Sequence, residues 1–221
     1  MLYIIASPIG NLGDISERAR LTIERVDLVA CEDTRETSKL LKHLSIKKPL
    51  LSCQAHDEDY KAQKIIAHLK EGKKVAYLSD AGTPGISDPG NLLVEAVVRE
   101  GLPVQAIPGA SALTTLLSIC GFNLAKGFIY AGFLPRTRGK FEKLILSAKI
   151  PLFAFESPYR IRKSLELIAE LSPTAQLCLG RELTKFYEQI LRGTASEISA
   201  IDFPEKGEFS LVLKPGKDIA K

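Results

Sequence analysis

Few side chains in this sequence are suited to binding metals or forming disulfides. Its 221 residues include only four cysteines and three histidines, and no two cysteines form a CxxC pair. Zinc centres and dithiol redox sites need such spacings, so we expect the cysteines to be reduced thiols of a hydrophobic core. The histidines stand apart from one another in the sequence, and we therefore expect no metal site.

Long apolar runs are also missing. No run reaches the length of a membrane span, and no basic region precedes a signal-like apolar segment at the N-terminus. We therefore expect a soluble, cytoplasmic protein. The hydrophobic content of 45% is too high for a disordered chain, and the length allows one large domain or two small ones.

Charge is distributed unevenly along the chain. Residues 1–117 contain 14 Lys and Arg against 15 Asp and Glu, whereas residues 118–221 contain 16 against 11. A basic C-terminal half suits a polyanionic partner such as RNA, although solvated surface lysines are an alternative explanation.

The stretch Ser79–Gly90, SDAGTPGISDPG, follows an apolar run that predicts a buried strand. Its glycines permit positive φ angles and allow a ligand to approach the backbone closely. Asp88 and Pro89 predict the N-cap and first residue of the next helix. Ligands of open α/β sheets bind at such carboxyl ends of strands, so this loop is either a binding site or a surface turn.

Other strand ends show a similar pattern. The run 2–6 predicts a strand that enters the loop SPIGNLG, and its glycines do not complete a GxGxxG dinucleotide motif. The run 27–31 predicts a second strand, which ends in the polar cluster EDTRE at residues 32–36. Asp33 or Thr34 can cap the helix that follows. This cluster could face a substrate, or it could serve only for capping and local ion pairing.

Strands that alternate with helices at short intervals predict an α/β fold with a parallel sheet for the first half. Two late strands without a long helix between them predict a mixed sheet in the second half. We place the two α/β domains at residues 1–115, a Rossmann-like domain, and 116–221.

Eight segments then occur in an order typical of one family. They are SPIGNLGDIS, CEDTRETSKLL, SDAGTPGISDPG, IPGASA, GFLPR, FESPYR, GRELTK and GEF, and they span nearly the whole chain. Together they resemble the ribosomal RNA small-subunit methyltransferase I family of the tetrapyrrole methylase superfamily. That resemblance implies two α/β domains with S-adenosylmethionine in the cleft between them, a homodimer, and methylation of a cytidine ribose 2′-hydroxyl in small-subunit ribosomal RNA. Members commonly continue into a small helical C-terminal region, which we expect to be missing from a chain that ends at Lys221.

The resemblance also implies a set of cofactor contacts. By position they are Pro8, Ile9, Gly10, Ser79, Asp80, Ala81, Thr83, Pro84, Ser111 and Ala112 in the first half, and Glu156, Leu183 and Phe209 in the second.

Methyl transfer from a sulfonium needs alignment and exclusion of water, and a ribose hydroxyl is a poor nucleophile that a base or a nearby charge would activate. The charged candidates flank predicted strand ends: Asp33, Arg35, Glu156, Arg160, Arg181, Glu182 and Lys185. Some of them could instead form only ion pairs. Candidate phosphate contacts lie in a basic loop and the start of the next helix: Arg136, Arg138, Lys140 and Lys143.

Two other functions fit the same residues. One is a methylase of a small molecule such as a tetrapyrrole, and the other is a non-catalytic RNA- or nucleotide-binding module. The basic segment at 136–143 argues against the first, and the Gly/Pro-rich loops at strand ends argue against the second.

Overall fold

The computed structural model describes residues 1–54 and 58–216, and it divides the chain into two compact units. The first is Met1–Ser111, and the second begins at Ala112. The predicted boundary after residue 115 lies four residues beyond this division. It falls inside helix α5 (Ala112–Ile119), which packs against the second sheet.

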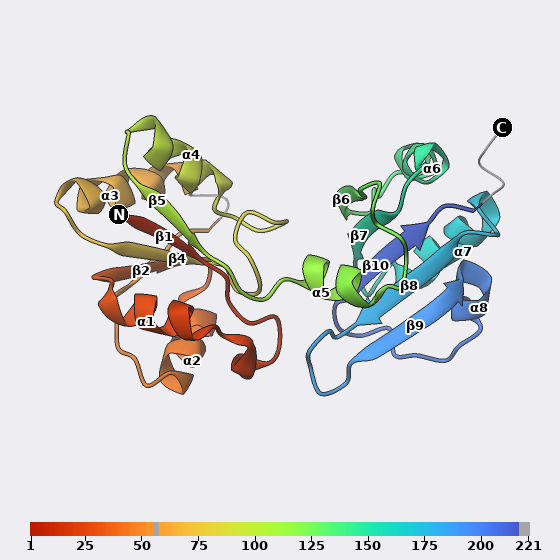
Figure 1. Cartoon of the computed structure of the whole chain (residues 1–221), viewed down its shortest axis with the longest axis horizontal. Coiled ribbons are helices and arrows are strands. Elements are labelled where there is room, and N and C mark those ends of the chain that lie inside the picture. Colours follow the sequence, from red (N-terminus) through yellow and green to blue (C-terminus); the bar gives the residue numbers. More distant parts are fainter. Residues whose placement is uncertain (55–57, 217–221) are drawn as a thin grey trace. The chain divides into compact units, whose positions relative to one another are not determined.

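The first unit is a five-stranded parallel sheet with helices on both faces (Figure 1). The strands lie in the order β3-β2-β4-β1-β5, so β1 is flanked by β4 and β5. The elements are β1 (Leu2–Ile5), α1 (Glu17–Arg25), β2 (Leu28–Cys31), α2 (Thr34–His43), β3 (Leu50–Ser52), α3 (Glu58–Lys70), β4 (Val75–Leu78), α4 (Asn91–Arg99) and β5 (Val104–Ile107).

Alternation of side chains along β1 explains why both faces of the sheet are covered. Leu2 and Ile4 pack with α3 and α4, whereas Tyr3 and Ile5 pack with α1 and α2. Successive side chains of a strand point to opposite faces, so a strand that is apolar at every position needs a layer of helices on each side. The expected Rossmann-like parallel sheet is confirmed.

Polar caps fix where the helices begin. Asp33 caps α2 by accepting a hydrogen bond from the Arg35 amide, and Ser16 caps α1 by accepting one from Ala19. The predicted start of α4 at Asp88 and Pro89 is wrong, because the helix begins at Asn91 with Gly90 as its N-cap. The loop after β4 is therefore longer than the predicted helix start at Pro89 implied.

The second unit contains a mixed sheet, as expected. Its order is β6-β7-β10-β8-β9, with β6 and β7 parallel and the other pairs antiparallel. The elements are β6 (Ile129–Phe133), α6 (Arg138–Ser147), β7 (Leu152–Glu156), α7 (Ile161–Leu171), β8 (Gln176–Arg181), β9 (Gln189–Thr194), α8 (Ala195–Ser199) and β10 (Phe209–Lys214).

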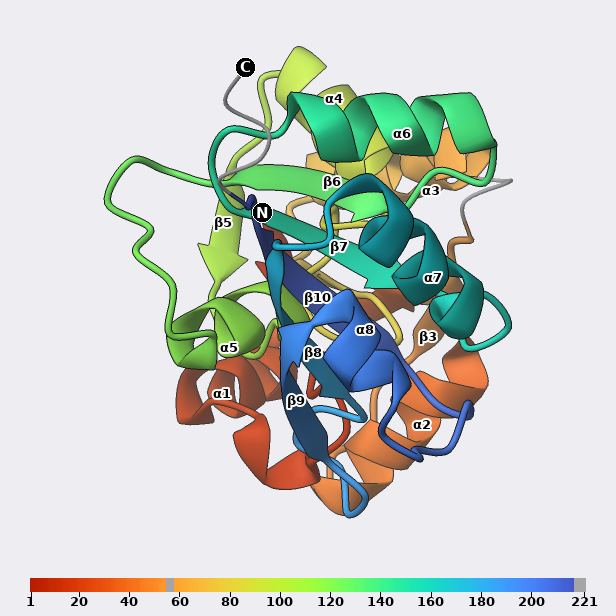
Figure 2. The same ribbon diagram turned by 90° about the vertical axis from the view of Figure 1, so that its right-hand side faces the viewer.

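One hydrophobic core holds this unit together. Helices α6, α7 and α8 cover the same face of the sheet (Figure 2), and Phe141, Leu165 and Ile198 bring their apolar sides to Leu211 and its neighbours. On the opposite face α5 lies over β10.

Within the described part of the chain, no helix combines the length and apolar character needed to cross a bilayer. The same residues contain no group of three or more His, Cys, Asp or Glu side chains that could hold a metal ion.

Candidate functional site

The carboxyl edge of the first sheet gathers the polar loops that the sequence singled out. The loops after β2, β4, β1 and β5 leave four adjacent strands in that order. Parallel strands direct all of these loops to one edge, which is where open α/β sheets bind ligands.

Backbone hydrogen bonds join two of the loops. The Ser7 amide donates to the Gly82 carbonyl at 2.9 Å, and the Gly82 amide donates back to Ser7 at 3.1 Å. The buried Ser7 hydroxyl also donates to the Ser79 carbonyl at 3.0 Å. The loop after β1 and the loop after β4 therefore form one structure.

Gly82 occupies a position that disfavours any larger residue. Its φ is +80°, and a Cβ added there would lie 3.2 Å from Cγ2 of Ile9. The next residue, Thr83, donates its hydroxyl to the Ala110 carbonyl at 3.2 Å, which joins the loop after β5 to the other two. Gly85 and Gly90 also have positive φ, so the expectation for all three glycines is confirmed.

The predicted cofactor residues of this unit fall on these joined loops. Pro8, Ile9, Ser79 and Pro84 are buried and support the backbone, whereas Ala81, Thr83, Ser111 and Ala112 are half-buried, and Gly10 and Asp80 are exposed. Their role as cofactor contacts stays a prediction.

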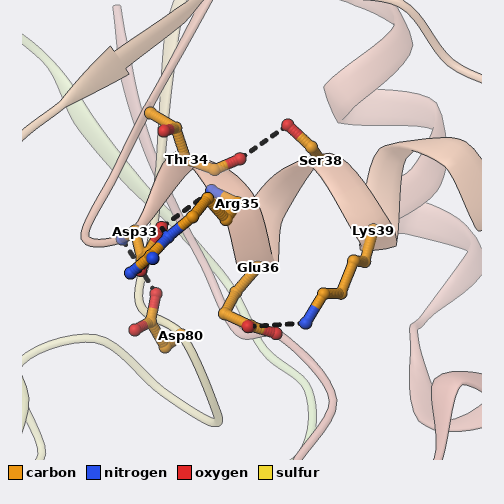
Figure 3. A network of polar contacts seen from close by, with 7 residues as sticks. All are labelled: Asp33, Thr34, Arg35, Glu36, Ser38, Lys39 and Asp80. Atoms are coloured by element: carbon orange, nitrogen blue, oxygen red, sulfur yellow. Dashed lines mark hydrogen bonds and ion pairs between the residues drawn. The ribbon is translucent and has the colours of Figure 1, made fainter.

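Acidic side chains meet where β2 and β4 end (Figure 3). The Asp33 amide donates to Oδ1 of Asp80 at 2.9 Å. The Asp80 amide donates in turn to Oε2 of Glu32 at 3.4 Å. Arg35 forms a bidentate pair with Asp33, with its closest contact at 2.6 Å from Nη2 to Oδ2. The Arg35 side chain is otherwise 84% exposed, so it can exchange this partner for a ligand.

The pKa values of the carboxylates in this cluster are shifted in opposite directions. Hydrogen bonds from the Arg35 side chain and amide lower the pKa of Asp33 to about 2. Partial removal from water raises the pKa of Asp80, and the charges of Asp33 and Glu36 raise it further. The pKa of Glu32 is raised by burial and then by the charge of Asp80. The cluster thus presents concentrated negative charge at the edge of the sheet.

In the second unit, Glu156 is buried at the end of β7. Its carboxylate pairs with Arg160 at 2.5 Å and accepts hydrogen bonds from the Ser157 amide at 2.6 Å and the Ser164 hydroxyl at 2.5 Å. Arg160 in turn donates to the Leu134 carbonyl. These contacts give Glu156 a structural role, and its predicted catalytic and cofactor roles stay untested.

Arg181 and Lys185 have fixed partners as well. Arg181 donates to the carbonyls of Lys206 and Tyr187 and to the side chain of Gln189. Lys185 pairs with Glu182 at 3.0 Å and with Glu208 at 3.2 Å. Both side chains stabilise the loop after β8, and their predicted catalytic role remains a prediction.

Leu183 and Phe209 lie beside this loop and are almost fully buried. Phe209 pairs with Glu156 on one side and with Arg181 on the other, so the ends of β7 and β8 share one edge of the sheet. The family resemblance had implied only that Glu156, Leu183 and Phe209 approach the cofactor.

Two strained residues in this loop were not predicted. Glu182 and Thr184 have φ of +52° and +66°, which costs about 1–3 kcal/mol each for residues other than glycine. Gly207 leaves room for the Glu182 side chain, because a Cβ at residue 207 would lie 2.5 Å from Oε1 of Glu182. The sequence drew attention to Gly207 through the segment GEF, but it did not indicate that this glycine contacts Glu182.

The four predicted phosphate contacts differ in availability. Arg138 pairs with Glu142 at 2.6 Å and with Glu170 at 2.5 Å, which raises its pKa. Arg136, Lys140 and Lys143 are not fully buried, and none forms an ion pair with another residue of 1–54 or 58–216. A phosphate would have to compete for Arg138 but not for the other three.

Comparison with known proteins defines the class. The family model described as Tetrapyrrole (Corrin/Porphyrin) Methylases matches residues 1–199. Among solved structures, a diphthine synthase has a TM-score of 0.74 at 16% identity and covers 96% of this chain and 89% of its own. A uroporphyrin-III-C-methyltransferase from Thermus thermophilus has a TM-score of 0.67 at 21% identity, covering 99% and 95%. Likeness at this identity shows the fold alone.

Curated relatives narrow the class further. A ribosomal RNA small subunit methyltransferase I from Thermotoga maritima is 45% identical over 98% of this chain and 99% of the relative. A protein of the same name from Neisseria meningitidis serogroup B is 41% identical, covering 98% and 77%. The chain therefore belongs to the tetrapyrrole methylase family and, within it, to the ribosomal RNA small subunit methyltransferase I group. Relatives of this group include both longer chains and chains of matching length.

Proposed function

We propose that this protein is an S-adenosylmethionine-dependent methyltransferase that acts on small-subunit ribosomal RNA, most specifically on the 2′-hydroxyl of a cytidine ribose. The observation that carries the proposal is the match to relatives of that name over 98% of the chain. Support for the cofactor comes from a uroporphyrin-III C-methyltransferase of the same fold, which was crystallised with S-adenyl homocysteine. A homodimer and a cytoplasmic location remain predictions.

The loops at the carboxyl edge of the first sheet suit this cofactor. S-adenosylmethionine carries a positive sulfonium and a positive ammonium group, and the cluster of Glu32, Asp33 and Asp80 supplies the opposite charge. Backbone groups of the joined loops around Gly82 provide donors and acceptors that stay fixed when a ligand binds. In the second unit, the pair of Glu156 and Arg160 would hold the strand end rigid during the reaction.

Methyl transfer to purified small subunits tests the proposal. Labelled S-adenosylmethionine should transfer its methyl group to the subunit, and mapping should place the product on a ribose. Naked RNA and a tetrapyrrole serve as alternative acceptors in parallel. Transfer only to the tetrapyrrole would replace the proposal with the small-molecule function that the family description allows.

The charge of Asp80 should contribute to cofactor affinity. Asp80→Asn keeps an oxygen that can accept from the Asp33 amide but removes the negative charge, so we expect about tenfold weaker S-adenosylmethionine binding by calorimetry. S-adenosylhomocysteine lacks the sulfonium charge. If Asp80 acts on that charge, Asp80→Asn should weaken the binding of S-adenosylhomocysteine less than the binding of S-adenosylmethionine.

The pH dependence of cofactor binding provides a second measurement of the same charge. Because the pKa of Asp80 is raised by partial removal from water, its contribution to cofactor binding should be lost as the pH falls, and at a higher pH than for an ordinary aspartate. The Asp80→Asn variant should lack this step. An identical pH profile in both proteins would show that Asp80 does not act by its charge.

Exposed cations of the second unit should bind phosphate groups of the RNA. Replacing Lys140 and Lys143 with Gln should weaken RNA binding and flatten its salt dependence by about one unit of slope for each lysine that binds a phosphate. Arg138→Gln is the matched comparison, because its guanidinium is already paired with Glu142 and Glu170. An unchanged slope in the double variant would assign both lysines to ordinary solvated surface.

A further inference from the structure

Two large aromatic side chains project into solvent from the loop between β8 and β9. Phe186 is 93% exposed and Tyr187 is 70% exposed. Their rings meet edge to face, with centroids 4.9 Å apart. Burial of such large side chains normally stabilises a fold, and two adjacent exposed rings do not contribute in this way. Exposed apolar patches of this kind mark interaction sites, so we expect a partner to cover the rings.

The backbone beneath the two rings is firmly held. Arg181 donates to the Tyr187 carbonyl at 3.1 Å, and the Thr184 amide donates to the Glu188 carboxylate at 2.6 Å. Leu183 is buried, and the Glu182 carboxylate accepts a hydrogen bond at 2.9 Å from the amide of Glu208, the residue that precedes β10. These contacts hold the backbone that carries the two rings, which lowers the entropy cost of ordering the loop when a partner binds.

A third exposed ring belongs to the same edge of the sheet. Tyr159, which is 95% exposed, lies three residues after the end of β7. The strand β10 pairs with both β7 and β8, so the backbones of Glu156 and Arg181 are separated by two strand spacings, or about 10 Å.

The polar groups around the rings have partners of their own. Lys185 is paired with Glu182 and Glu208, and Glu188 accepts the Thr184 amide. The surface on offer is thus flat aromatic faces and not free positive charge. Such faces suit unpaired nucleobases, which stack on aromatic rings with little dependence on sequence.

We propose that Phe186 and Tyr187 form a stacking platform for unpaired bases of the RNA substrate, with Tyr159 as a further contact on the same edge. This inference rests on the proposed RNA function and identifies where the second unit holds single-stranded RNA. The platform complements the exposed lysines of α6, which would contact phosphates.

The absence of tryptophan from the chain allows a direct test. Phe186→Trp introduces a single tryptophan whose fluorescence should be quenched when a base stacks on it. The probe is a single-stranded, cytidine-rich RNA of about eight nucleotides, within the site sizes of other single-strand-binding proteins. The variant Tyr60→Trp is the matched control, because Tyr60 lies on α3 and is 64% exposed. Its fluorescence should not be quenched by the probe.

Binding measurements on three variants complete the test. The double variant Phe186→Ala, Tyr187→Ala should bind the probe about tenfold or more weakly, with an unchanged salt slope and unchanged S-adenosylmethionine affinity. Phe186→Leu should not restore binding, because leucine lacks a flat ring. Tyr60→Ala should bind the probe as the wild type does.

Each other outcome has a distinct meaning. Equal probe affinity in the double variant and the wild type would overturn the platform, and so would full binding by Phe186→Leu, which would indicate an apolar contact with a protein. Wild-type protein that fails to methylate small subunits would instead refute the proposed function. Quenching of Phe186→Trp by RNA would then still establish the platform as an RNA-binding surface.

Discussion

Gly82→Val should abolish S-adenosylmethionine binding, with affinity reduced by about 100-fold or more. Valine must leave the φ of +80° or accept a strain of about 1–3 kcal/mol, and its Cβ would lie 3.2 Å from Ile9. Either response displaces the backbone that pairs Ser7 with Gly82 and so disturbs the loops after β1 and β4 together. Calorimetry on the folded variant measures the effect.

Gly72→Val is the matched control for this substitution. Gly72 has φ of +82°, but no atom lies within 4 Å of an added Cβ, and the residue is in the turn after α3. The control should lose comparable stability and keep its cofactor affinity. Full affinity in a folded Gly82→Val would contradict the assignment of this loop to the cofactor.

Glu156→Ala should destabilise the second unit by about 3 kcal/mol, at the lower end of the range for breaking a buried ion pair. The carboxylate is fully buried, and its removal leaves Arg160 and Ser164 without their partner. Arg160 stays 26% exposed, which limits the cost because water can still reach it. Urea unfolding measures the change.

Glu142→Gln provides the comparison on the surface. Glu142 and Arg138 have the same i,i+4 spacing in the same unit, but both are substantially exposed, so their pair should contribute less than about 0.5 kcal/mol. A small effect at both positions would refute the structural role of Glu156. Cofactor titration of the conservative variant Glu156→Gln then decides the cofactor role: unchanged affinity would remove Glu156 from the predicted contacts.

The alternation of strands and helices in the first unit follows from signals that are local in the sequence, whereas the order of the strands in the sheet does not. Short apolar runs predicted the strands β1, β2 and β4. The polar cluster after β2 offered Asp33 or Thr34 as the helix cap, and the structure uses Asp33. Helix starts near proline were predicted less well, since Asp88 and Pro89 precede the true start of α4 by two to three residues. A proline fixes only its own φ and does not determine where a helix begins.

Contacts between segments that are far apart in the chain could not be predicted from the sequence. The bonds between Ser7 and Gly82 join residues 75 positions apart, and the contact of Gly207 with Glu182 spans 25 positions. The burial of Glu156 depends on Arg160, which the sequence indicated only as another charged candidate. Charged residues at strand ends are visible in the sequence, but the partners that fix them emerge only from the fold.

The central place of β1 has a consequence for synthesis of the chain. The first strand made needs β4 on one side and β5 on the other, and the second partner is complete only at Ile107. A nascent chain that has not yet reached this residue exposes an apolar strand with an open hydrogen-bonding edge. Such non-local pairing slows folding and favours aggregation of incomplete chains. Formation of the first sheet during translation should therefore depend on release of about half the chain from the ribosome.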